Sequence, residues 1–234
     1  MKRLLLVSVM LVAGNALGLA NSLCVNDATL QSYITGNTTF ATACQIGDKL
    51  FWGFQLTNGP LAIGAEPDAT QIQVQTIPGD GFSNIGISFN SGGWFISGGI
   101  PIDQVVSYNV ATVSGNPLIK DATLTITGNL IGSGGSAQVR ETLSPAVPGS
   151  PLTAALPSTV SVNIDFTGNN VSSLAVSNRI TLIGGPGIGD AAHISVFEND
   201  FSEAVSTPEP LLSLPLGAGL VILGLARRKR AQHS

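Results

Sequence analysis

The sequence is poor in charged and metal-binding side chains. Only 10% of its 234 residues are Asp, Glu, Lys or Arg, and it has two histidines, His193 and His233, and two cysteines. Because His233 lies at the extreme C-terminus, zinc sites with two histidine ligands are excluded from the central part of the chain. The Gly-x-Ser-x-Gly motif of hydrolase nucleophile elbows is also missing. These absences leave few ways to build a catalytic centre.

Positive charge is scarce in the middle of the chain. Six of the ten Lys and Arg residues lie within the first three residues and at positions 227–230. Between residues 21 and 207, four basic residues face thirteen acidic ones, a formal charge of −9 against −4 for the whole chain. Such a segment has little with which to neutralise phosphates, so we expect no nucleic-acid partner.

The N-terminus has the pattern of a secretory signal peptide. Lys2 and Arg3 precede the uncharged run 4–13, and the small residues Gly18 and Ala20 stand at the −3 and −1 positions of a cleavage site. The run is too short to span a bilayer. We therefore predict a signal peptide at residues 1–20, which uses the Sec translocon and is removed by signal peptidase.

A second uncharged run lies near the C-terminus. As a helix, residues 211–226 would be about 24 Å long, against a hydrocarbon core of about 30 Å. Pro215 and three glycines weaken that helix further. The run is followed by the basic cluster Arg227, Arg228, Lys229 and Arg230, which favours a cytoplasmic location for the tail 227–234. We predict a marginal transmembrane helix at about 211–226.

The end of the chain resembles the PEP-CTERM sorting signal of exported proteins from Gram-negative bacteria. The resemblance covers residues 206–234 and rests on the order of its parts: Pro208, Glu209 and Pro210, the apolar run, and the basic cluster. It implies recognition and processing by a membrane-embedded exosortase. It also implies an inner-membrane intermediate, then a location at the cell surface or in the extracellular matrix, with exopolysaccharide and biofilm. A plain C-terminal membrane anchor is the alternative, so the tail is either cleaved or retained.

The two cysteines form an even pair in a chain expected to be exported. Cys24 and Cys44 therefore predict a disulfide, whose loop of about 20 residues would contribute about 3 kcal/mol. A free-thiol or metal-binding pair is the alternative. A metal site would need further ligands, and no histidine lies nearby.

The middle of the chain, residues 21–205, has the pattern of one all-β domain. Asn26 or Asp27 can cap a short helix whose apolar residues Leu30, Tyr33 and Ile34 share a face. After Cys44 apolar residues alternate with polar ones, between turns rich in Gly and Pro. The expected strands are 50–56, 71–77, 85–89, 94–97, 104–113, 121–130, 137–142, 159–166, 179–183 and 193–197. We predict an antiparallel β-sandwich or jelly roll of about ten strands, with the Pro-rich stretch 144–158 as a long surface loop.

Few side chains remain as candidates for binding. Trp52 and Trp94 lie in apolar strands and are expected to pack in the core or on a sheet face, whereas an exposed tryptophan beside Asn and Gln would favour stacking on a sugar. Glu198 and Asp200 are weak calcium candidates, since oxygen ligands in loops suffice for that ion, although solvated acidic turns are the simpler interpretation.

No catalytic residue and no cofactor is predicted. We expect a non-enzymatic exported protein, with a carbohydrate- or calcium-binding module as the alternative. A secreted hydrolase, which would need two carboxylates across a cleft, is least favoured.

Overall fold

The computed structural model describes residues 21–204, apart from residues 63, 65, 81, 82, 99, 100, 115 and 159. The predicted signal peptide and the whole predicted sorting signal lie outside the described residues. This also applies to the expected transmembrane helix at 211–226. Within the described part, no helix combines the length and the apolar character needed to cross a membrane.

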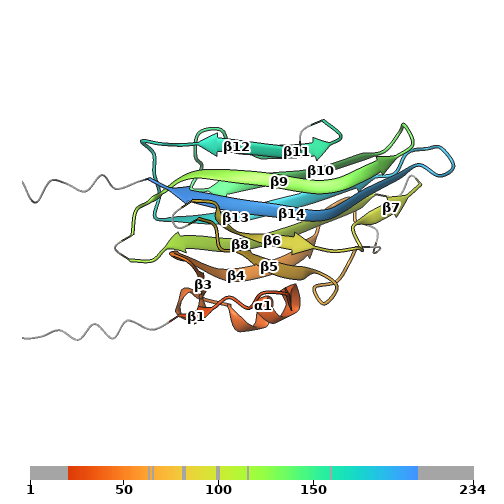
Figure 1. The fold of residues 1–234 in the computed structure, drawn as a ribbon. Helices are drawn as coiled ribbons and strands as arrows, with labels where there is room; N and C mark the ends of the chain where they lie inside the picture. The colour runs from red at the N-terminus through yellow and green to blue at the C-terminus, as the bar shows by residue number, and fades with distance from the viewer. Residues whose placement is uncertain are drawn as a thin grey trace, which may run out of the picture.

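Two β-sheets face each other across one core (Figure 1). Sheet A has the spatial order β1 (Ser22–Leu23), β3 (Cys44–Ile46), β4 (Lys49–Asn58), β8 (Ile102–Thr112), β13 (Ser173–Ile183), β10 (Ser136–Ser144) and β11 (Leu152–Leu156). Sheet B has the order β12 (Ser161–Asp165), β9 (Ile119–Ile131), β14 (Ala191–Glu203), β6 (Ile85–Asn90), β5 (Gln73–Ile77) and β2 (Ala28–Thr29), and β7 (Phe95–Ser97) also pairs with β14. Every pairing between these strands is antiparallel except that of β1 with β3. The predicted all-β sandwich is confirmed.

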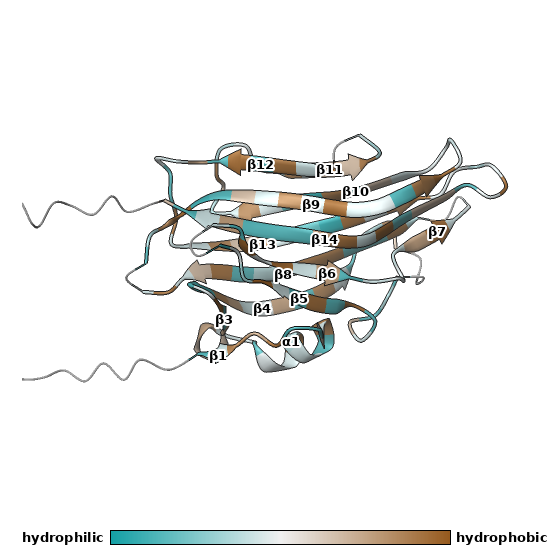
Figure 2. Ribbon diagram, in the orientation of Figure 1, coloured by the Kyte–Doolittle hydropathy of each residue, from teal (hydrophilic) through white to brown (hydrophobic). Residues whose placement is uncertain are grey.

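The alternation in the sequence sets which face of each strand points inward. In β10, Ala137, Val139, Glu141 and Leu143 are buried, and the residues that alternate with them are exposed. Figure 2 shows the resulting bands of hydrophobic and hydrophilic residues along the strands. Burial of these apolar side chains contributes about 25 cal/mol per Å² of area removed from water. This burial is the main force that holds the two sheets together.

The N-terminal helix is present, but its predicted cap is wrong. Helix α1 (Leu30–Gly36) begins after Thr29, whose hydroxyl accepts a hydrogen bond from the Ser32 amide at 3.4 Å. The Asn26 side chain instead accepts a bond from the amide of Thr76 in β5, and that of Asp27 accepts one from the side chain of Gln75. These bonds hold the chain against sheet B as β2, so the helix cannot start until β2 ends. A short 3₁₀ turn, η1 (Phe40–Thr42), follows.

The predicted disulfide is confirmed. Cys24 and Cys44 are bonded, and their Cα atoms are 4.7 Å apart. The bond connects the segment after β1 to the start of β3, so it fixes the N-terminal segment to the edge of sheet A. No cysteine within the described range is free.

The Pro-rich stretch is not simply a loop, which corrects the expectation for residues 144–158. Within it, β11 pairs with β10 and buries Leu152 and Ala154. Pro151 and Pro157 flank the strand rather than interrupting it. Because β11 is at the edge of sheet A, the prolines remove no bond from a central ladder.

Candidate functional site

The outer face of sheet A carries a shallow hollow that spans four strands. It has a volume of about 390 Å³ and crosses β4, β8, β13 and β10. We call it the sheet A hollow, and its lining is Gly53, Gln55, Ser107, Tyr108, Asn109, Thr142, Ser144, Ala175, Val176 and Ser177. None of these residues is charged, but most carry a hydroxyl or an amide. Such a surface offers neutral hydrogen-bonding groups.

The strand register aligns the outward-facing residues of the hollow, together with Trp52 beside it, in two rows. One row is Gln55, Ser107, Ser177 and Thr142, and the other is Trp52, Asn109, Ala175 and Ser144. The members contributed by β13 are small, whereas those contributed by β4 are long. Neighbouring strands are about 4.8 Å apart, so each row extends over about 14 Å. The difference in side-chain size creates a groove with a taller wall along β4.

A bulge in β4 places both long side chains on this wall. The pairing of β4 with β8 shifts between Trp52 and Gln55, so that these residues, three apart, both face outward while Phe51 and Phe54 are buried. Gly53 has a φ of +69° there, and an added Cβ would lie 2.6 Å from the Asn109 amide nitrogen. Its N–H leaves the ladder and donates to the Asn37 carbonyl. Glycine is therefore required for this arrangement.

The two tryptophans have different environments. Trp94 is fully buried, as expected, and its indole N–H donates to the Gln104 side chain at 2.8 Å. Trp52 is half-buried on the outer face. Its ring packs edge-to-face with the ring of Phe40, and the two ring centroids are 5.1 Å apart. Phe40 is itself 57% exposed. Trp52 therefore lies opposite Asn109, and the bulge brings Gln55 to the same face. A tryptophan beside Asn and Gln side chains favours stacking on a sugar.

Two arginines form the next row along the strands. Arg179 of β13 lies directly opposite Arg140 of β10. Arg179 donates two hydrogen bonds of 2.7 Å to the Asp103 carboxylate, and this contact raises the pKa of Arg179 and lowers that of Asp103. Arg140 is exposed and makes no ion pair with any residue that the structure describes.

Arg140 is therefore the free cation of the described part of the chain. Of the other two basic residues there, Lys120 is 3.8 Å from Asp121, and Lys49 is buried between carboxylates. Like charges directly opposite each other destabilise a sheet, and Asp103 neutralises only one of the two arginines. The face beside the hollow thus carries an exposed arginine in a strongly acidic domain.

A polar cluster inside the core was not predicted from the sequence. Glu141 of β10 points inward and is fully buried. The Asn199 amide donates to Glu141 and to Asn178, and its carbonyl oxygen accepts from Tyr108 at 2.9 Å and Asn178 at 2.7 Å. Burial, and secondarily the charge of Asp200, raises the pKa of Glu141 to about 8. The position of Glu141 between Val139 and Leu143 was the available signal.

The weak calcium candidates share a face but have no third ligand. Glu198 and Asp200 are two residues apart on β14 and point away from the core. Burial, and then the Glu198 charge, raises the pKa of Asp200 to about 6. Across the residues with described positions, no group of three His, Cys, Asp or Glu side chains could hold a metal ion. Pro208, Glu209, Pro210 and the basic cluster 227–230 lie outside these positions.

A larger hollow of about 640 Å³ lies beside the disulfide. Its lining comes from residues 21–28, α1 and the segment 41–44. One wall is the start of the described chain, and the residues before it are not described. We therefore do not regard it as the functional site.

Comparison with known proteins gives no family. No family model matches the chain, and no curated protein matches it either. A solved structure of TmCBM61 in complex with β-1,4-galactotriose is similar over 75% of this chain and 98% of that one, with 10% identity and a TM-score of 0.31. A similarity this low does not establish a common fold.

Proposed function

We propose that the protein is an exported, non-enzymatic surface or extracellular-matrix protein that binds an acidic polysaccharide along the outer face of sheet A. The observation that carries the binding proposal is the sheet A hollow, with Trp52 beside it, opposite Asn109, and Arg140 in the next row along the strands. Delivery through the PEP-CTERM signal and an exosortase is the second part of the proposal. The disulfide fits an oxidising compartment and supports export.

The chemistry of the hollow fits an extended glycan. A pyranose ring presents an apolar face that can lie on an aromatic ring and hydroxyls that can pair with amides and other hydroxyls. Trp52 offers the aromatic ring, and Gln55, Asn109 and Ser177 offer the hydrogen-bonding groups. Arg140 offers donors for a uronate or another acidic substituent. A binding site of this type needs no enclosed pocket, because a polymer makes many weak contacts.

Binding can be tested with the full chain on immobilised polysaccharides. The panel contains alginate and polygalacturonate as acidic polymers and galactan and dextran as neutral ones. We expect binding to the acidic polymers that weakens as salt is raised, because exposed charges are screened. A charge-assisted hydrogen bond contributes about 1.5–3 kcal/mol, so Arg140→Gln should weaken binding at least about tenfold.

Two further variants locate the contact. Trp52→Ala should weaken binding to every polymer that binds, whereas Phe95→Ala, an exposed aromatic paired with β14 of sheet B, should leave it unchanged. Circular dichroism checks that each variant is folded. Failure of all four polymers to bind would contradict the proposal. Equal binding of acidic and neutral polymers, without an effect of Arg140→Gln, would show that the ligand need not be acidic. In that case an unchanged affinity of Trp52→Ala would contradict binding at the outer face of sheet A.

A further inference from the structure

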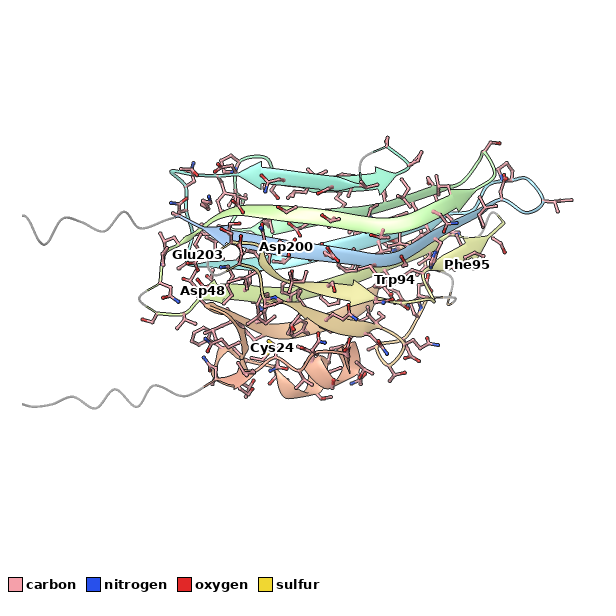
Figure 3. All side chains as sticks on the ribbon, in the orientation of Figure 1. Cys24, Asp48, Trp94, Phe95, Asp200 and Glu203 are labelled. Atoms are coloured by element: carbon pink, nitrogen blue, oxygen red, sulfur yellow. A yellow bond between two sulfur atoms is a disulfide. The ribbon has the colours of Figure 1, made fainter. Side chains whose placement is uncertain are left out.

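A buried charge cluster at one end of the sandwich joins the two sheets. It consists of Asp48, Lys49 at the start of β4 in sheet A, and Glu203 at the end of β14 in sheet B. Lys49 and Glu203 are 154 residues apart in sequence. Figure 3 places Asp48 and Glu203 at the same end of the molecule. The cluster therefore bridges segments that are far apart in the sequence.

The lysine has no contact with solvent. Its Nζ is 3.1 Å from Asp48 Oδ1 and 3.2 Å from Glu203 Oε1. The side chains of Lys49 and Glu203 are 0% exposed, and that of Asp48 is 9% exposed. The second oxygens, Asp48 Oδ2 and Glu203 Oε2, are buried and accept no hydrogen bond from an N–H or O–H group of the residues that the structure describes. Two carboxylates and one ammonium group would leave a net negative charge in a dry site, which is costly.

Protonation of one carboxyl group relieves that charge. Burial, and then the neighbouring Asp48 carboxyl, raises the pKa of Glu203 to about 7, although Lys49 opposes the shift. Glu203 is therefore the carboxyl group of the cluster that is favoured to carry the proton. A lysine side chain and an uncharged carboxyl group in contact, with a second carboxyl group beside them, are the components of amide formation.

We propose that Lys49 Nζ and Glu203 Cδ form an intramolecular amide bond, with Asp48 as the proton acceptor. The ammonium group passes one proton to Asp48, and the free amine attacks Glu203 Cδ. The bond from Cδ to the hydroxyl oxygen then breaks, and the hydroxyl leaves as water with a second proton from the nitrogen. The third proton stays on the amide nitrogen, and Asp48 retains the first. The step needs no oxidant, cofactor or second substrate.

Two physical factors favour the bond. Holding the reacting groups in contact gives a high effective concentration, which for well-oriented groups reaches about 10⁵ M or more. Exclusion of water limits the reverse hydrolysis. Formation of the amide also replaces a buried ammonium–carboxylate pair by uncharged groups. Asp48 is disfavoured as the acceptor of the amine because it precedes Lys49 directly, so that amide would close a small ring across one peptide bond. Glu203 has no such constraint.

Mass spectrometry of the full chain tests the proposal. The folded protein is incubated at pH 7, reduced to open the disulfide, denatured and digested with trypsin. We expect no cleavage after Lys49 and a peptide containing Lys49 joined to the peptide containing Glu203, with a mass lower than their sum by one water. Asp48→Asn should reduce the yield of the joined peptide at least severalfold. Lys120→Arg, which changes a surface ion pair, should leave it unchanged.

The result that overturns the proposal is equally direct. Recovery of separate Lys49 and Glu203 peptides from folded wild-type protein would show that the cluster is only an ion pair. An amide joining Lys49 to Asp48 would also overturn it. If Asp48→Asn forms the joined peptide at the wild-type rate, Asp48 is not the proton acceptor, and that part of the mechanism is wrong. Should any variant fail to fold, the wild-type digest alone decides.

Discussion

Replacement of Glu141 by Gln should change how the stability of the protein depends on pH. Glu141 is buried in the core, and the elements around it contribute Tyr108 from β8, Asn178 from β13 and Asn199 from β14. Asp200 of β14 adds a nearby charge that also raises the pKa of Glu141. Gln has nearly the same shape as a protonated Glu and can still accept the bond from the Asn199 amide. The substitution therefore removes a titrating proton with little change in packing.

The expected magnitude follows from the pKa. Folding raises the pKa of Glu141 from 4.5 to about 8, so the folded protein holds a proton that the unfolded chain releases between these values. This contribution is fully present below pH 4.5 and is lost as the pH rises through about 8. One pKa unit corresponds to about 1.4 kcal/mol, which gives up to about 5 kcal/mol over the full window. That is comparable to the whole stability of a small domain.

Urea denaturation at a series of pH values between 5 and 8 measures the effect. The wild-type free energy of unfolding should fall with pH, by about 1.4 kcal/mol per unit from Glu141 alone. The Glu141→Gln variant should lose that component and should be the more stable protein at pH 8. The variant should keep a slope of the same sign that is weaker than that of the wild type. This remaining slope comes from Asp200, whose pKa is raised to about 6, and from any Glu203 that has not formed an amide, whose pKa is raised to about 7. Asp80→Asn, in an exposed turn, serves as the control. Parallel wild-type and Glu141→Gln profiles would refute the reasoning.

Three other predictions concern the disulfide, the buried Trp94 and the sorting motif. Replacing Cys24 and Cys44 by Ser should lower the free energy of unfolding by about 3 kcal/mol in urea, because the bond closes a loop between residues 20 apart in sequence; an unchanged midpoint would show that it does not constrain the unfolded chain. Trp94→Phe removes the donor to Gln104 and should cost about 1–3 kcal/mol, whereas Phe95→Ala, at 48% exposure, should change the thermal midpoint little. Glu209→Ala should impair processing by the proposed exosortase without unfolding the sandwich, as the mass of the mature protein would report. Equal processing of that variant would remove the role proposed for the Glu209 charge.

Local patterns in the sequence predicted much of the fold. Alternating apolar residues in 121–130 and 137–142 indicated strands that became β9 and β10, and the cysteine pair indicated the disulfide. Strand β11 was missed because its prolines suggested a loop, although they only flank an edge strand. The Asn26 and Asp27 side chains suggested a helix cap but bind β5, a contact that requires knowledge of the tertiary fold.

The candidate site was harder to predict than the fold. Its rows combine β4, β8, β13 and β10, whose order in sheet A differs from their order in sequence. No local pattern places Gln55 beside Ser107 or Arg140 opposite Arg179. The bulge at Gly53 also reverses the inward and outward positions of β4, so strict alternation assigns Gln55 to the wrong face. Pairing between distant strands therefore determines the site.

The proposal that the outer face of sheet A binds an acidic polysaccharide is tested most directly by NMR mapping. The isotope-labelled protein is titrated with an alginate oligosaccharide, and changes in backbone amide shifts are followed residue by residue. We predict that the changes concentrate on Trp52, Ser107, Ser177 and Arg140, and that the outward-facing residues of β9 and β14 in sheet B do not shift. Shifts confined to sheet B, or none at saturating ligand, would contradict the account.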